Sequence, residues 1–114
     1  MAVNKVLIHI SDRDKWPAVF RQLALLLERD DSVDMKIAIL ADVFAGTVCT
    51  ACSPELEQQM SDFVKSGHRI LTCEESLRCL NIKTEKLPAF IQLAPTALGE
   101  IIRLLEEGYQ YIKV

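Results

Sequence analysis

Four cysteines are the residues of this 114-residue sequence with the clearest chemical potential: Cys49, Cys52, Cys73 and Cys79. A thiolate can act as a nucleophile, bind a metal ion or exchange with a disulfide. A chain of this length buries roughly two-thirds of its unfolded surface, so its core needs no disulfide to fold. We therefore interpret the cysteines as free thiols, metal ligands or redox groups in preference to structural disulfide bridges.

Cys73 has the best position for a nucleophile. It ends a predicted strand and directly precedes a predicted helix, where free backbone N–H groups and the positive helix end favour the thiolate. Glu74 and Glu75 follow immediately, and their negative charges oppose ionisation. A small buried hydrophobic side chain is an equally simple interpretation of a lone cysteine at such a position.

Cys49 and Cys52 form a CxxC pair, for which dithiol redox chemistry, a metal site and an incidental pairing all stay open. A thioredoxin-like pair lies in the first turn of a helix, whereas Cys52 here precedes the predicted N-cap Ser53. A zinc or iron–sulfur site would borrow Cys73 and need a fourth ligand. Cys79 lies six residues after Cys73, about 600° of helical rotation and thus 120° away from it, so we expect Cys79 to be structural.

The remaining polar groups favour simpler roles. His68 lies at the opposite end of its strand from Cys73, roughly 16 Å away. His9 lies near the carboxyl end of the first predicted strand, where a histidine satisfied within the fold is the simpler interpretation. Asp12 and Asp14 could bind Mg²⁺, but helix capping explains them more simply. The sequence has no GxGxxG, GxxxxGK[ST] or GxSxG pattern, so we expect no nucleotide cofactor, and we assign no metal site.

Composition argues against several classes of protein. Thirteen Lys and Arg against sixteen Asp and Glu give a formal net charge of −3 without a basic run, which argues against a nucleic-acid or anionic-membrane binder. No apolar stretch approaches the roughly 18 residues that span a bilayer. The N-terminus has no signal-peptide pattern. We expect a cytoplasmic location, where thiols stay reduced.

The elements that must position the cysteines alternate between strand and helix. Apolar, β-branched runs predict five strands, at residues 5–10, 35–40, 69–73, 89–93 and 109–114. This alternation predicts βαβ units and hence one α/β domain, residues 1–114, with a parallel sheet between two helical layers. Ligands and reactive groups of such sheets collect at the carboxyl ends of the strands, which is where Cys73 lies.

Capping and helix-breaking residues delimit the predicted helices. The first helix contains Pro17 in its first turn and ends near Glu28, before a break at residues 30–32. Ser53 begins the second, Glu74 a short third and Thr96 the last. Residues 41–52 predict a loop or a ragged short helix. In the last helix we expect four residues to face the core: Leu98, Ile101, Ile102 and Leu105.

Three segments of the chain resemble the DsrE/DsrF-like family of small sulfur-metabolism proteins: the opening KVLIHIS with its Trp-containing first helix, RILTCEESL and the final EEGYQYIKV. The resemblance covers nearly the whole chain, although TVCTAC is not part of the general family pattern. It implies a three-layer α/β/α fold with strand order 4-3-2-1-5 and a homo-oligomer, a trimer or hexamer. In that order the second and third strands are neighbours, which would bring the CxxC loop within reach of Cys73.

The resemblance also implies a function. In the family's sulfur-relay members a cysteine carries sulfur as a persulfide, a role that falls here on Cys73. We therefore expect a sulfur carrier or sulfurtransferase-like protein that exchanges sulfur with donor and acceptor proteins, with Cys49 or Cys52 resolving or relaying it. Two alternatives stay open: a non-catalytic oligomeric interaction module, and a cysteine-based redox or metal sensor.

Overall fold

The computed structural model describes residues 4–28 and 34–114. Within these residues, five parallel strands form one sheet in the order β4-β3-β2-β1-β5. The strands are β1 (Lys5–Ile10), β2 (Lys36–Ala41), β3 (Arg69–Cys73), β4 (Gln92–Ala94) and β5 (Gln110–Lys113). The predicted parallel sheet and its strand order are confirmed.

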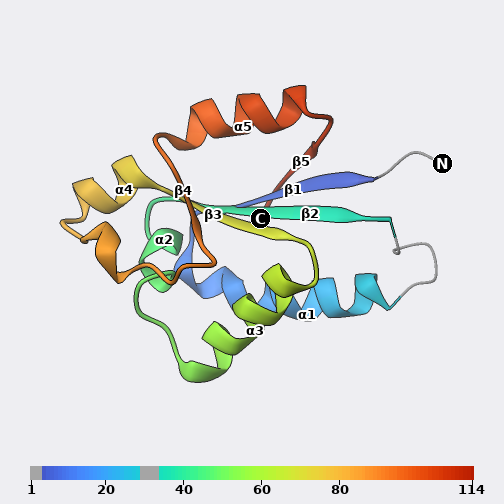
Figure 1. Cartoon of the computed structure of the whole chain (residues 1–114), viewed down its shortest axis with the longest axis horizontal. Coiled ribbons are helices and arrows are strands. Elements are labelled where there is room, and N and C mark those ends of the chain that lie inside the picture. The colour runs from blue at the N-terminus through green and yellow to red at the C-terminus, as the bar shows by residue number, and fades with distance from the viewer. Residues whose placement is uncertain (1–3, 29–33) are drawn as a thin grey trace.

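Helices cover both faces of this sheet, which confirms the three-layer architecture (Figure 1). Helices α1 and α3 lie on one face and α5 on the other. The helices are α1 (Trp16–Leu27), α2 (Ala45–Val48), α3 (Pro54–Lys65), α4 (Glu74–Cys79) and α5 (Ala97–Glu106), with 3-10 turns η1 (Arg13–Lys15) and η3 (Thr84–Lys86). The predicted break at residues 30–32 lies outside the described residues. Within the described part of the chain, no helix is long and apolar enough to cross a membrane.

Predicted capping signals set the ends of α3 and α5. Ser53 Oγ accepts a hydrogen bond from the Leu56 N–H at 3.2 Å, and Thr96 Oγ1 accepts one from the Gly99 N–H at 3.1 Å. Gly67 ends α3 with φ +100° and Gly108 follows α5 with φ +99°, a backbone region that favours glycine. The short helix α2 is one of the two outcomes expected for residues 41–52.

Each face of the sheet buries its own hydrophobic cluster. Side chains alternate along a strand, so neighbouring residues of β1, β2 and β3 belong to different clusters. On the α1 and α3 face the cluster includes Ile8, Ile10, Ile37, Ile39, Ile70, Trp16, Phe20, Met60 and Phe63. On the α5 face it consists of Leu7, Ala38, Leu40, Leu71, Leu104 and Tyr109. The same alternation places Cys73 on the α5 face, with Leu71.

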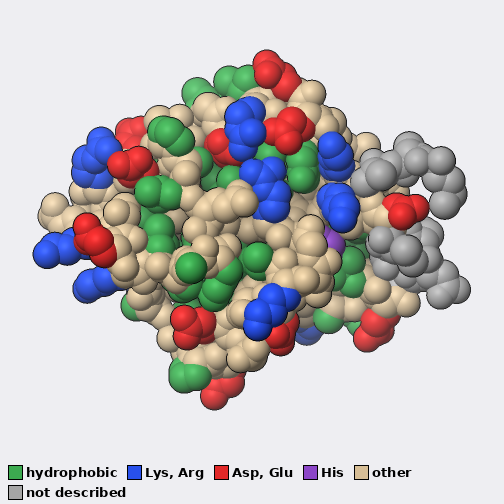
Figure 2. Space-filling model, in the orientation of Figure 1, with side chains coloured by type: hydrophobic (Ala, Val, Ile, Leu, Met, Phe, Trp, Pro, Cys, Tyr) green, Lys and Arg blue, Asp and Glu red, His purple; other side chains and the backbone are tan. Residues whose placement is uncertain are grey.

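The expected orientation of α5 is wrong. Leu98, Ile102 and Leu105 are 70%, 50% and 45% exposed, whereas Leu104 is fully buried and Ile101 packs partly against its cluster. Figure 2 shows hydrophobic side chains on the outer side of this helix. Two apolar stripes run side by side along α5, at positions 97, 101, 104 and 98, 102, 105, about 100° apart. Helical spacing cannot decide which stripe faces the sheet.

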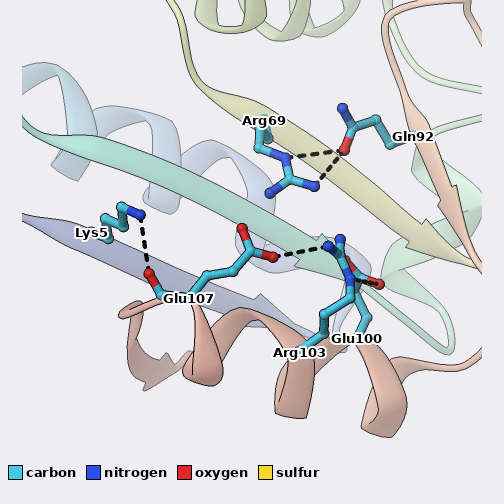
Figure 3. A network of polar contacts seen from close by, with 6 residues as sticks. All are labelled: Lys5, Arg69, Gln92, Glu100, Arg103 and Glu107. Atoms are coloured by element: carbon cyan, nitrogen blue, oxygen red, sulfur yellow. Dashed lines mark hydrogen bonds and ion pairs between the residues drawn. The ribbon is translucent and has the colours of Figure 1, made fainter.

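Polar contacts accompany the rotation of α5 that the structure adopts. The Glu100 side chain is buried beside the sheet and is paired with Arg103, which also donates to Glu107 at 2.8 Å (Figure 3). Lys5 Nζ donates to the main-chain oxygen of Glu107 at 3.0 Å and ties the end of α5 to β1. A buried carboxylate without such a partner would be costly, so this ion pair keeps Glu100 tolerable on the inner side.

The fourth strand is shorter and later than predicted. Residues 89–91 form a turn in place of the strand's first half, with the Ile91 N–H donating to Pro88 O at 3.1 Å. Ile91 is buried in the core from this turn, which explains the apolar signal without a strand. Arg69 of β3 donates twice to Gln92 Oε1, at 3.1 and 2.9 Å, and fastens the short edge strand (Figure 3).

The orientation of α5 predicts unequal costs for two substitutions on the same helix. Leu104→Ala removes a fully buried side chain and should lower the free energy of unfolding by about 2–5 kcal/mol. Ile102→Ala removes a half-exposed one and should cost the monomer about 1 kcal/mol or less. Urea unfolding at a low protein concentration measures both. Equal losses would show that the helix presents both stripes to the core.

Candidate functional site

A cavity of about 360 Å³ opens beside Cys73 at the carboxyl end of the sheet. Its walls come from the segment after β2, from the end of β3 with α4, and from the start of α5. The lining residues are Asp42, Val43, Cys73, Glu75, Ser76, Cys79, Leu80, Thr96, Ala97 and Leu98. Two thiols, two carboxylates and a largely apolar wall therefore share one space, and none of the lining residues is a cation.

Backbone contacts hold the cavity walls together around Cys73. Cys73 is 3% exposed and forms the N-cap position of α4 in an extended conformation. The Glu75 N–H donates to Pro95 O at 3.3 Å, which joins α4 to the segment before α5. The Val43 N–H donates to Ser76 Oγ at 3.0 Å and joins the segment after β2 to α4.

Val43 has a strained backbone at this junction. Its φ of +50° is rare for a β-branched residue and costs on the order of 1–3 kcal/mol. Such strain persists only where surrounding contacts over-determine the conformation, and it concentrates at functional sites. The hydrogen bond to Ser76 is one of those contacts. These surrounding contacts hold Val43, the residue directly after Asp42, in one conformation at the cavity wall.

Asp42 is the best-connected side chain of the cavity. Its Oδ1 accepts a hydrogen bond from Ser11 Oγ at 2.6 Å and lies 3.0 Å from His9 Nε2. Lys113 Nζ in turn donates to Ser11 Oγ at 2.6 Å. Burial alone would raise the pKa of Asp42, but the close contact with His9, the hydrogen bond from Ser11 and the charges of His9 and Lys113 outweigh burial and lower the pKa. Asp42 is therefore a fixed negative charge at neutral pH.

His9 joins this carboxylate to the edge strand β5. Its Nδ1 lies 2.6 Å from the Tyr111 hydroxyl, and the two rings meet edge to face with centroids 5.7 Å apart. Its Nε2 is buried and faces Asp42 at ion-pair distance without the alignment of a hydrogen bond. With both nitrogens engaged, His9 is a positioning residue for Asp42 and does not itself line the cavity.

The CxxC pair lies on the other face of the sheet. Cys49 is 2% exposed, belongs to the core cluster on the α1 and α3 face and interacts with the side chain of Thr72. Thr72 and Cys73 are successive residues of β3, so their side chains point to opposite faces. Cys52 is half-buried, and neither Cys49 nor Cys52 lines the cavity of Cys73. The structure does not bring the CxxC pair to Cys73.

Cys79 lines the cavity instead, and the expectation of a purely structural Cys79 does not describe its position. Helical rotation does not relate the two thiols, because Cys73 is an extended N-cap residue outside α4. Cys79 is exposed at the end of α4. Asp42 was also missed, although a lone acid directly after a buried strand is a usable signal in the sequence.

The other candidate residues have structural surroundings. His68 lies before β3, accepts a hydrogen bond from the Ile37 N–H at 3.2 Å and stacks on Phe63. Burial and the charge of Lys36 lower the pKa of His68. The fully buried Trp16 donates to Ala45 O at 3.1 Å and anchors α2.

Within the described part of the chain, the acidic, histidine and cysteine side chains form no cluster suited to a metal ion. Asp12 and Asp14, which could have bound Mg²⁺, are exposed in and beside η1. Among residues 4–28 and 34–114, no group of three or more His, Cys, Asp or Glu side chains could hold an ion.

Burial of Cys49 predicts an alkaline loss of stability. Burial raises the pKa of the Cys49 thiol from 9.0 to about 12, and the nearby Cys52 adds to the rise. Between pH 9 and 12 the unfolded chain has lost this proton while the folded chain keeps it, so the free energy of unfolding falls as pH rises, by on the order of 4 kcal/mol. Cys49→Ala should lose this component, because it has no thiol to ionise.

Urea unfolding of both proteins at pH 7, 9 and 10.5 measures that difference. Cys79→Ala is the matched control, since it removes an exposed thiol, and it should follow the wild-type pH dependence. Parallel curves for wild type and Cys49→Ala would contradict the buried, neutral thiol.

Comparisons with known proteins agree with this geometry at the level of the fold. The chain matches a protein of unknown function, MTH1491 from Methanobacterium thermoautotrophicum, with a TM-score of 0.83 and 21% identity, covering 97% of this chain and 99% of that one. The ychN protein from E. coli matches with a TM-score of 0.68 and 11% identity over 96% and 99% of the two chains. BT1422 of Bacteroides thetaiotaomicron, of unknown function, matches with a TM-score of 0.66 and 14% identity over 100% and 98%.

Sequence comparison identifies the family. No curated protein matches the chain significantly. The family model of DsrE/DsrF-like proteins matches residues 35–114, which include β2 to β5 and the whole lining of the Cys73 cavity. The chain therefore belongs to the DsrE/DsrF-like family.

Proposed function

We propose that this protein is a sulfur carrier that holds sulfane sulfur as a persulfide on Cys73. The observation that carries the proposal is a nearly buried thiol at the carboxyl end of a central strand, lining a cavity with space for a further sulfur atom. Family membership supports it, because the resemblance implies a cysteine that carries sulfur at this position. Cys73 is the last residue of β3, and its thiol would carry the sulfur.

The chemistry consists of two thiol exchanges without net oxidation. The Cys73 thiolate attacks the outer sulfur of a donor persulfide, R–S–SH, so that a bond from Sγ to that sulfur forms and the donor S–S bond breaks. The donor leaves as a thiolate and accepts the proton that Cys73 released. In the second exchange an acceptor thiolate attacks the outer sulfur, and Cys73 leaves as the thiolate.

The cavity suits storage more than rapid nucleophilic attack. Its apolar wall limits access of water and of bulky thiols to a persulfide on Cys73, which would otherwise exchange with any thiol present. The fixed charge of Asp42 disfavours a second negative charge in the same space. We infer that the donor delivers sulfur in an uncharged group or in a protein-bound persulfide, because small inorganic anions are repelled.

Persulfide transfer predicts a mass change that depends on Cys73. Incubation with an excess of a persulfide donor should add about 32 Da, one sulfur atom, to the wild-type chain, and reduction should remove it. Cys73→Ser should gain no adduct at that position. Cys79→Ser, which removes the exposed thiol of the same cavity, should keep it. Intact mass and peptide mapping give the result.

Two outcomes would contradict the proposal: a wild-type chain without a sulfur adduct on Cys73, and a Cys73→Ser chain with the same total adduct. Thermal unfolding of each variant serves as the folding control. If mapping places the sulfur on Cys49 or Cys52, the predicted relay role of the CxxC pair becomes the carrier role.

The charge of Asp42 predicts which reagents reach Cys73. In the wild type, Cys73 should react more slowly with anionic iodoacetate than with neutral iodoacetamide. Asp42→Asn should lower the ratio of the iodoacetamide rate to the iodoacetate rate about three- to tenfold, because the substitution removes a unit charge from the cavity. Asp62→Asn, on the exposed face of α3, should leave the difference unchanged. An unchanged ratio in Asp42→Asn would show that Asp42 does not act on the thiol.

A second candidate function is a non-catalytic oligomeric interaction module. The exposed apolar stripe of Leu98, Ile102 and Leu105 favours it, because contiguous apolar surface of this kind often marks a contact between proteins. Assembly as a trimer or hexamer through such a surface is compatible with both functions. The mass experiment separates them, since a module with incidental cysteines forms no specific persulfide on Cys73.

We place the carrier in the cytoplasm, where its thiols and its donor and acceptor proteins stay reduced.

A further inference from the structure

A second cavity, of about 480 Å³, lies at the carboxyl edge of the sheet and is separate from that of Cys73. Three cations line it: Arg13 of η1, and Lys83 and Lys86 from the segment after α4. Thr47, Thr50 and Asn81 supply the main polar atoms between them, and no lining residue is acidic. The two cavities share no lining residue.

The three cations have no carboxylate partner among the residues that the structure describes. Within the described residues, none of Arg13, Lys83 and Lys86 forms an ion pair. The acidic neighbour Glu85 lines an adjacent hollow together with Glu74 and Arg78; Lys83 borders both spaces but forms no ion pair within the described residues. Unpaired like charges around one space repel one another, and this chain carries more acids than bases with which to pair them. An anionic ligand removes that repulsion.

The donors in this cavity suit an oxyanion. Thr47 Oγ1 donates to Phe44 O at 2.6 Å and Thr50 Oγ1 donates to Thr47 O at 2.9 Å, so neither hydroxyl proton is free for a ligand. Arg13 offers the forked N–H donors that match phosphate oxygens, and each lysine adds an ammonium group. The side-chain amide of Asn81 adds a neutral N–H donor group to the lining. Charged donors of this kind favour the binding of a dianion over the binding of a neutral molecule.

We propose that this cavity binds a small organic phosphomonoester or a comparable dianionic ester. The volume of about 480 Å³ exceeds what a bare phosphate group fills and lies in the range of small-molecule pockets. Ala51 and Ile82 provide apolar surface for the organic part. Thr50 and Ala51 are the two residues between Cys49 and Cys52, so the ligand covers the loop of the CxxC pair.

The position in the fold supports a ligand site. η1 follows β1, α2 follows β2, and residues 81–86 follow β3 and α4, so segments after three neighbouring strands converge here. Parallel sheets bind their ligands at this edge. The Cys73 cavity, with Asp42 and Glu75 and no cation, repels the same ligand. This proposal does not depend on the sulfur chemistry of Cys73.

Backbone amide NMR shifts test it with phenyl phosphate, inorganic phosphate and chloride at constant ionic strength. Phenyl phosphate should shift the signals of residues 47–51 and 81–86 at lower concentration than inorganic phosphate, and chloride should shift them least. Arg13→Gln, and Lys83→Gln combined with Lys86→Gln, should each weaken phenyl phosphate binding about tenfold, as expected for loss of a charge-assisted hydrogen bond. Arg21→Gln is the matched control, because it removes an exposed arginine that does not line the cavity.

The outcomes are distinct. Binding of inorganic phosphate alone would overturn the organic ligand class and leave an adventitious ion. No binding beyond chloride, shifts confined to other residues, or equal effects of Arg13→Gln and Arg21→Gln would overturn the site. The variants should keep the wild-type unfolding temperature without ligand, since the three cations stabilise no ion pair in the described fold.

Discussion

The alternation of side chains along β3 divides the chemistry of this protein between two faces of the sheet. Thr72 points toward the α1 and α3 face, where its hydroxyl donates to Ala41 O at 3.0 Å and meets Cys49. Cys73, one residue later, points toward α5. Because β3 is paired on both sides, by β2 and β4, its register cannot slip to bring the two cysteines together. The separation of the thiols follows from this pairing.

The two cavities at the carboxyl edge differ in charge and therefore in what they can admit. Carboxylates line the cavity of Cys73 and cations line the one over the CxxC loop. The net charge of the chain is −3, yet three cations lie together without ion pairs in the described structure. The charges are therefore unevenly distributed over this edge of the sheet. A neutral sulfur compound and an anionic ester could occupy the two cavities at once. Binding at one would leave the contacts of the other intact.

Much of the fold was predictable because its signals are local. The strands 5–10 and 69–73 match their predicted bounds, and Ser53 and Thr96 cap the helices that they were expected to begin. The strand order came from the family resemblance. The spacing of apolar residues did not predict the rotation of α5, because two stripes of this helix are equally apolar. It also did not predict the start of β4, because the buried residue Ile91 belongs to the preceding loop. The cavity of Cys73 was predictable only in part, because Asp42 and Cys79 approach it through tertiary packing.

The contacts that hold Asp42 join the first and last strands of the chain. His9 meets Tyr111, and Ser11 meets Lys113, each across a separation of 102 positions. During synthesis, Cys73 and Asp42 leave the ribosome well before Tyr111 and Lys113, so the thiol exists for a time without the network that fixes its acidic neighbour. The acidic side of the Cys73 cavity is thus completed only once β5 has paired with β1. Only a chain that includes β5 presents Cys73 in the setting described here.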